Sequence, residues 1–189
     1  MIAQAGEAGG HTGDIPFTVL IPRIVDVCKG HKSPLTGKPI MVLAAGGVYD
    51  GRGLAASLAH GAAGVWVGTR FVMAKEAGAP KAHKEAIRKA TFEDMRRTVI
   101  FTGRPLRLVT TPYIEEWEKR PEKIKELTSK GIVPVMWDLE QDDPDGSKMK
   151  GALAHHFAGM CAAVIDDIPY AREIINTVRK LRSVSWLAA

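Results

Sequence analysis

Residues 39–69, PIMVLAAGGVYDGRGLAASLAHGAAGVWVGT, decide the fold. The opening run, PIMVLAA, is apolar and β-prone, like strands that are buried on both faces of a sheet. Two glycines end this run, and residues 50–61 then have the pattern of a short helix, with Asp50 as N-cap and Gly61 at its end. A second apolar strand, AGVWVG, follows. A strand, a helix and a strand with short glycine-rich links predict a parallel sheet.

The flanking segments continue this alternation. The first residues, MIAQ, read as the end of a buried strand, and a glycine-rich loop follows them. Residues 15–30 place apolar side chains at helical spacing and end at Gly30, and another helix is expected over 79–90. A closed barrel of parallel strands needs eight of them. This α/β chain has two complete strands and one stub, so it reads as the back end of a larger unit.

The sequence pattern changes after Lys89. Residues 98–112, TVIFTGRPLRLVTTP, are expected to be extended and irregular, and a charged helix then runs to about Gly131, broken or restarted at Pro121. WDLEQDDPDGSK is expected to be a polar acidic loop, and ALAHHFAGMCAAVI and PYAREIINTVRKLR are expected to be two final helices. We therefore divide the chain into three parts: a parallel α/β part at 1–90, an extended segment, charged helix and acidic loop at 91–148, and C-terminal helices at 149–189.

Composition indicates an ordinary globular protein. The 189 residues allow one sizeable core, and 46% hydrophobic with 25% charged residues is the usual balance. Cys28 and Cys161 are too far apart to indicate a disulfide framework or a metal cluster, and they favour a reducing compartment. No apolar run approaches the roughly 20 residues of a membrane span. Without a secretory or transit signal, the expected location is the cytoplasm.

The net charge of +5 raises the question of nucleic-acid binding. The basic residues are mixed with glutamates, as in EEWEKRPEKIKELTSK. This mixture is typical of a solvated helix face rather than of a surface that follows phosphates, so no nucleic-acid partner is expected. A mildly positive surface favours small anionic substrates.

Glycines follow each expected strand, in QAGEAGGH, LAAGGVYDGRG and VWVGTRF. The carboxyl ends of parallel strands meet on one side of the sheet, where ligands bind. Glycine lets backbone N–H groups approach an anion, and a helix N-terminus beyond it adds partial positive charge. One interpretation is that these are turn glycines, which are needed only for positive φ. We favour a phosphate site, formed by Gly46, Gly47, Gly68 and Thr69.

His11 is the candidate catalyst, because it follows EAGG at the same end of the sheet and imidazole exchanges protons near neutral pH. It would abstract a proton from a bound substrate or donate a hydrogen bond to it. Glu7 would either orient His11 or bond to the backbone. The other histidines are weaker candidates, namely His31, His60, His83, His155 and His156. HExxH, CxxC, GxSxG and Walker patterns are all absent from the sequence, and no metal site is expected.

Three stretches together resemble the nitronate monooxygenase family, formerly called 2-nitropropane dioxygenases: IAQAGEAGGHTGD, VLAAGGVYDGRGLAASLAHGAAGVWVGTRF and KEAGAPKAHKEAI. The later TVIFTGRPLRLVTTPYIEEWEKR resembles the extension of fungal-type and related members. The resemblance covers most of residues 1 to about 134. It implies an FMN-binding TIM barrel with a smaller helical domain. This chain would supply the last parallel strands of the (β/α)8 barrel, followed by a mostly helical C-terminal region.

The resemblance also implies roles for single residues. Gln4 and Gly9 would lie near the flavin, and His11 matches the family's active-site histidine. The FMN phosphate would be held by Gly46, Gly47, Gly68 and Thr69. The implied reaction oxidises an alkyl nitronate with oxygen to a carbonyl compound and nitrite. His11 would abstract the α-proton of a neutral nitroalkane or hydrogen-bond its nitro group, whereas a nitronate, already anionic, needs no base.

The sequence departs from the family in two ways. Ala5 stands where most members have glycine, which crowds the loop slightly. The first five barrel strands would precede MIAQ, and Met1 stands where an internal strand residue is expected. We therefore expect a truncated or mis-started reading frame, or a fragment.

Two alternatives remain open. FMN- and NAD(P)H-dependent enoyl-acyl-carrier-protein reductases have a similar EAGGH loop and GTRFV strand, although TGRPLRL favours the first family. A non-catalytic remnant without flavin is the other alternative. It would expose apolar strands and self-associate, and an open barrel edge would in any case favour a homo-oligomer. The physiological substrate is not predicted, because most of the pocket wall would come from outside this chain.

Overall fold

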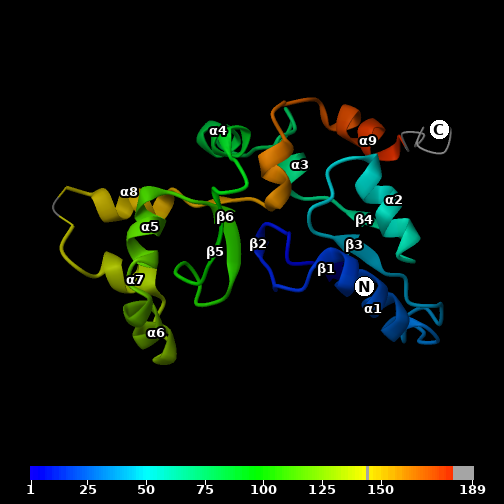
Figure 1. The fold of residues 1–189 in the computed structure, drawn as a ribbon, viewed down its shortest axis with the longest axis horizontal. Helices are drawn as coiled ribbons and strands as arrows, with labels where there is room; N and C mark the ends of the chain where they lie inside the picture. Colours follow the sequence, from blue (N-terminus) through cyan, green and yellow to red (C-terminus); the bar gives the residue numbers. More distant parts are fainter. Residues whose placement is uncertain (144, 181–189) are drawn as a thin grey trace.

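The computed structural model describes residues 1–143 and 145–180. Figure 1 shows three parts: a parallel sheet with helices α1 and α2, a central antiparallel sheet, and a group of helices, α5 to α8, at the opposite end. The protein therefore has the α/β fold expected from its sequence.

The parallel sheet has the order β1-β3-β4, with β1 over Ile2–Gln4, β3 over Leu43–Ala45 and β4 over Gly64–Trp66. Helix α1 (Phe17–Cys28) connects the first two strands, and helix α2 (Gly51–Ala59) connects the second and third. Both strand pairs are parallel, which confirms the predicted strand–helix–strand unit.

The ends of helix α2 follow from single residues, as predicted. The Asp50 carboxylate accepts hydrogen bonds from the backbone N–H groups of Arg52 and Gly53, which have no partner inside the helix. Gly61 has a φ of +87° just after the helix, a conformation that costs glycine nothing. Gly30 ends α1 in the same way, with a φ of +82°.

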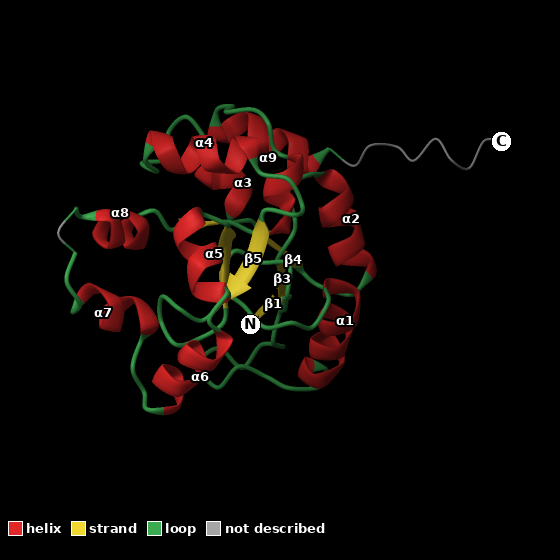
Figure 2. Cartoon of the chain, turned by 60° about the vertical axis from the view of Figure 1, so that its left-hand side comes forward, coloured by secondary structure: helices red, strands yellow, loops and turns green. Residues whose placement is uncertain are grey.

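The expectation that the strands are buried on both faces is wrong. Ala3 and Ala44 pack against α1 on one face, and helices α1 and α2 lie along the same side of the sheet (Figure 2). On the other face Ile2 is 48% exposed and Trp66 is 57% exposed. Among the described residues, helices thus cover one face only, so the apolar side chains of the second face reach solvent.

The central sheet is built around β6 (Leu106–Val109). One edge of β6 pairs along its whole length with β5 (Met95–Thr98) in antiparallel register. The other edge pairs with β2 (Gly10–His11) and then with β7 (His156–Phe157). Residues 106–109 are extended, as expected, but they form a regular strand, so the expectation of irregular structure is wrong for β6. The two neighbours of β6 on that edge are distant in sequence.

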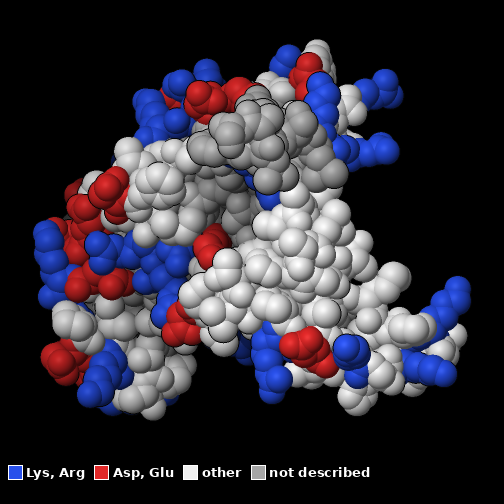
Figure 3. Space-filling view, turned by 45° about the vertical axis from the view of Figure 1, so that its right-hand side comes forward, with Lys and Arg blue, Asp and Glu red and all other residues white. Residues whose placement is uncertain are grey.

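The helical group comprises α5 (Pro112–Glu118), α6 (Pro121–Ser129), α7 (Pro134–Leu139) and α8 (Ser147–Leu153). The predicted break at Pro121 is confirmed. The predicted acidic loop is shorter than expected, because α7 and α8 extend into its two ends. On the face that Figure 3 shows, acidic and basic side chains are interspersed over this group. Its core joins the central sheet through Leu106, Leu108, Ile114, Trp117, Ile124 and Leu127.

The expected helix over 152–165 is wrong. Helix α8 ends at Leu153, β7 follows, and a short 3₁₀ helix covers Met160–Val164. Pairing with β6 holds this segment extended, and Gly159, with ψ 172°, continues the extended backbone. The remaining helices are α3 (Thr69–Val72), α4 (Lys81–Lys89) and α9 (Ala171–Arg179).

Helix α9 confirms most of the last predicted helix, although residues 181 and 182 of that prediction lie outside the described residues. Tyr170 and Glu173 form a capping box at its start. Within the described part of the chain, the helices are too short or too polar to cross a lipid bilayer.

Replacing Asp50 by alanine is expected to lower the free energy of unfolding by about 1 kcal/mol. The N–H groups of Arg52 and Gly53 would lose their acceptor at the start of α2. Urea unfolding followed by circular dichroism measures the change. Asp26→Ala is the matched control, because Asp26 is exposed in the last turn of α1. An equal loss of stability in both variants would contradict the role of the cap.

Candidate functional site

A hollow of about 280 Å³ lies at the carboxyl ends of β1, β3 and β4. Its wall includes every residue that the sequence suggested for a cofactor site: Gln4, Gly9, Gly46, Gly47, Gly68 and Thr69. The structure therefore brings these six residues together.

The register of the parallel sheet explains why they meet. Gln4 pairs with Ala45, and Ala45 pairs with Trp66, so the last residues of the three strands form one row. All three line the hollow. The chain turns away directly after each strand, which leaves the following backbone beside the same space.

Gly46 and Gly47 expose backbone to the hollow. Their φ values of +100° and +73° favour glycine, and a Cβ on Gly46 would lie 3.0 Å from the carbonyl oxygen of Ala5. Among the described residues, the N–H groups of Gly46, Gly47 and Val48 have no hydrogen-bond acceptor. Three successive free N–H groups beside a hollow are an arrangement that binds anions.

Gly68 is a different case. Its φ is −105°, which any residue adopts, and a Cβ there would meet no atom within 4 Å. The interpretation as a turn glycine fits Gly46 and Gly47 in part, but neither conformation nor close packing requires a glycine at Gly68. What distinguishes Gly68 is that it lines the hollow and leaves open space beside it.

Thr69 connects the hollow to the C-terminal part of the chain. Its hydroxyl oxygen accepts a hydrogen bond of 2.9 Å from the N–H of Gly159, and the residue is 9% exposed. The hydroxyl hydrogen remains able to donate. Burial raises the pKa of the neighbouring Cys161 thiol to about 11, although a hydrogen bond with Thr69 opposes that rise. Cys161 is therefore a neutral wall residue at neutral pH and not a nucleophile.

Sequence reasoning missed the residues that close the hollow from the C-terminal side, Phe157 and Cys161. The backbone there approaches the glycine loop so closely that a Cβ on Gly9 would lie 2.5 Å from the backbone of Ala158 and Gly159. Gly159 was the available signal, because a glycine inside an expected helix often marks a close approach or a break.

His11 lies apart from the hollow. Its side chain is exposed and absent from the lining, although the adjacent Gly10 lines the wall. The ring Nε2 lies 2.9 Å from the hydroxyl of Thr102, in the turn between β5 and β6. The Gln4 side-chain amide donates to the carbonyl of His11. The structure thus places His11 next to the site but turned toward the β5–β6 turn.

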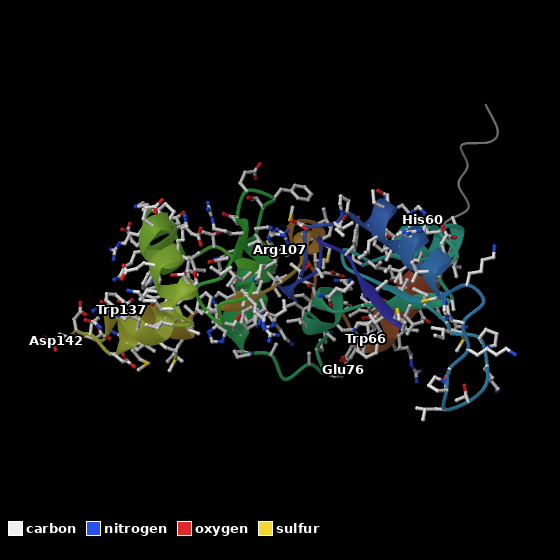
Figure 4. All side chains as sticks on the ribbon, turned by 90° about the horizontal axis from the view of Figure 1, so that it is seen from below. His60, Trp66, Glu76, Arg107, Trp137 and Asp142 are labelled. Atoms are coloured by element: carbon white, nitrogen blue, oxygen red, sulfur yellow. The ribbon has the colours of Figure 1, made fainter. Side chains whose placement is uncertain are left out.

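Glu7 and Arg107 hold the glycine loop. Glu7 accepts a hydrogen bond from the N–H of Phe17 at the start of α1, so it bonds to the backbone instead of orienting His11. Arg107 donates to the carbonyl of Gly6 at 3.0 Å. Burial, followed by the charge of Arg97, lowers the pKa of Arg107. In Figure 4, Arg107 lies between the helical group, which carries Trp137, and the parallel sheet.

Several known proteins are similar to this chain. A family described as nitronate monooxygenase matches residues 1–180. A Rhodococcus jostii protein, named (3aS,4S,5R,7aS)-5-hydroxy-7a-methyl-1-oxo-octahydro-1H-indene-4-carboxyl-CoA dehydrogenase, is 40% identical over 214 residues, which cover 94% of this chain and 57% of that protein.

Two solved structures are similar over 94% of this chain. FabK from Thermotoga maritima has a TM-score of 0.68 and 30% identity, and 52% of its chain is covered. Nitroalkane oxidase from Streptomyces ansochromogenes has a TM-score of 0.69 and 26% identity, with 49% covered. The chain spans about half the length of the curated relatives it matches.

Replacing Thr69 by valine is expected to destabilise the protein by about 1–3 kcal/mol, because the buried N–H of Gly159 would lose its acceptor. Thr69→Ser keeps the hydroxyl and loses one methyl group, at a cost of about 0.8 kcal/mol. Urea unfolding of both variants measures the difference. Equal stability of the valine and serine variants would contradict a structural role for this hydrogen bond.

Proposed function

The chain belongs to the nitronate monooxygenase family, and from this premise we propose that it forms part of an FMN-dependent oxidoreductase that oxidises alkyl nitronates. The observation that carries the proposal is that the backbone N–H groups of Gly46, Gly47 and Val48, beside the glycine-lined hollow, have no hydrogen-bond acceptor in the described part of the chain. A phosphate group is an anion that accepts such hydrogen bonds, so these residues fit the phosphate end of FMN.

The proposed residue roles follow from the lining of the hollow. Gly46, Gly47, Gly68 and Thr69 hold the phosphate, and Gln4 and Gly9 lie beside the ring system. Ligand pockets usually measure roughly 300–1,000 Å³. The hollow, at about 280 Å³, lies just below that range, which suits the phosphate and part of the cofactor.

For the architecture, we propose that β1, β3 and β4 are the last strands of a (β/α)8 barrel. The exposed side chains of Ile2 and Trp66 on the uncovered face of the sheet support this proposal, since that face would be the barrel interior. Residues 1–90 are then the barrel part, 91–148 the intervening segment and 149–189 the C-terminal region.

Bound FMN would accept electrons from the nitronate and pass them to oxygen, which yields a carbonyl compound and nitrite. The protein's contribution is to hold the cofactor and to place a base. In the proposed tautomer Nε2 of His11 carries the proton and donates to the Thr102 hydroxyl 2.9 Å away, and that hydroxyl can in turn donate to the carbonyl of Arg104 at 3.3 Å. Nδ1 of His11 then keeps its lone pair and accepts the α-proton of a neutral nitroalkane.

A second candidate function is that of an FMN- and NAD(P)H-dependent enoyl-acyl-carrier-protein reductase, which reduces enoyl thioesters. The similarity to FabK, and a relative named as a CoA dehydrogenase, favour it. Consumption of NADH with an enoyl thioester would support this candidate, whereas oxygen uptake with a nitronate supports the first.

The remaining alternative is a chain that binds no flavin by itself and associates through the open edges of β1 and β4 into a homo-oligomer. The cytoplasm is the proposed location.

The chain is expected to retain a visible flavin band after incubation with FMN and desalting. Gly68→Asp should weaken FMN binding by about tenfold or more, because a carboxylate would stand beside the phosphate in a space with no steric conflict. Gly68→Asn is the matched control of the same size without the charge. Riboflavin, which lacks the phosphate, should bind both variants alike. A colourless wild-type chain would refute flavin binding by this chain alone.

His11→Asn is expected to lower the rate with neutral nitroethane by about 100-fold or more, through loss of the proton acceptor. The rate with the ethyl nitronate anion should stay within about twofold, because that substrate has already lost its proton. Oxygen uptake with each substrate measures the two rates. An equal fall with both substrates would show that His11 acts in binding or folding and not as a base.

A further inference from the structure

A second hollow lies in the helical group. It is a groove of about 570 Å³ between α5 and α8, and Asp138 of α7 forms its floor. Helices α5, α7 and α8 are neighbours in the helical group (Figure 2). The groove shares no lining residue with the glycine-lined hollow. It is therefore a separate site, and its volume falls inside the range of small-molecule pockets, roughly 300–1,000 Å³.

The wall formed by α5 is aromatic and fixed in place. The Tyr113 hydroxyl donates to Oδ2 of Asp138 at 2.8 Å, and the Trp117 indole N–H donates to the same oxygen at 3.3 Å. A Cβ on Gly151 of α8 would lie 2.5 Å from the Tyr113 ring, so the ring packs directly on the α8 backbone. Trp117 is 3% exposed, so the half-buried Tyr113 is the ring that offers a flat ligand a fixed surface at low entropic cost.

The two walls also carry positive charge without a partner. Arg120 lies at the junction of α5 and α6, as the N-cap residue of α6, and Lys150 lies on α8; both line the groove. Among the described residues, neither side chain makes a hydrogen bond or an ion pair. Arg120 and Lys150 are therefore available to a ligand.

The acidic side chains of the groove are already engaged. Asp138 is 8% exposed and accepts from both aromatic side chains, with Lys148 Nζ 3.8 Å from its other oxygen. Glu116 forms an ion pair with Lys119. The uncompensated charge of the groove is therefore positive, next to an aromatic wall.

We propose that this groove binds a flat aromatic organic anion. The aromatic body lies against Tyr113, and the phosphate, sulfonate or carboxylate group lies between Arg120 and Lys150. An inorganic anion would leave the aromatic wall uncovered, and a neutral aromatic compound would leave both cations unpaired. Both parts of the ligand are therefore required.

Titration of the full chain with AMP and with naphthalene-2-sulfonate tests the proposal, by calorimetry and by the NMR signal of the Trp117 indole N–H. At least one of these aromatic anions is expected to bind and to shift that signal. Adenosine, naphthalene and inorganic phosphate, each lacking one part, should bind at least about tenfold more weakly. Absence of binding by both aromatic anions, or equal binding of inorganic phosphate alone, would overturn the proposal.

Variants locate the site. The double variant Arg120→Gln, Lys150→Gln should raise the Kd of the aromatic anion by about tenfold, since two charge-assisted contacts are lost. Lys125→Gln is the matched control, because Lys125 is exposed on α6 and does not line the groove. Gly68→Asp should leave this binding unchanged. A ligand that responds to Gly68→Asp but not to the double variant occupies the glycine-lined hollow, which would overturn the proposal without affecting the proposed function.

Discussion

Strand β6 presents two edges, and the way they are shared determines how the parts of the molecule meet. Strand β5 covers one edge completely, while β2 and β7 lie end to end along the other. These two short strands belong to segments more than 140 residues apart, the glycine loop and the C-terminal segment. Because both are bonded to the same backbone, Gly9 and Gly159 come into contact, and Thr69 can accept the N–H of Gly159. The closed side of the glycine-lined hollow depends on this shared edge.

The parallel sheet forms the other side of that hollow through the alignment of its strand ends. Its register aligns the ends of three strands, and the turn after β3 leaves backbone N–H groups that have no acceptor within residues 1–143 and 145–180. An anion bound there would satisfy donors that the fold itself leaves unpaired. The same donors would cost free energy if they were buried without water or ligand. Such a site thus follows from how the strands end, and it needs few side chains.

This difference explains how far the sequence could predict the structure. Asp50, Gly61 and Pro121 act on the backbone within a few residues of themselves, so the helix boundaries that they set were predictable. The β7 strand was not, because its partner in β6 lies about 50 residues away and small apolar residues suit a helix equally well. The position of His11 depends likewise on β6, which turns its ring toward Thr102. Residue types indicated which residues could line the hollow, but pairing between segments distant in sequence determined which of them face it.

The groove between α5 and α8 could not be predicted from the sequence either. No motif marks it in the sequence, because its aromatic and basic residues read as the ordinary faces of two charged helices. The packed structure shows the role of Asp138: its buried carboxylate accepts hydrogen bonds from Tyr113 and Trp117 and fixes both rings. The same carboxylate oxygen is therefore already occupied and is not available to a ligand. Arg120 and Lys150 then remain as the cations of the walls without a described partner. Backbone donors form the first hollow and side chains form the second, so glycine patterns reveal the former whereas only the packed structure reveals the latter.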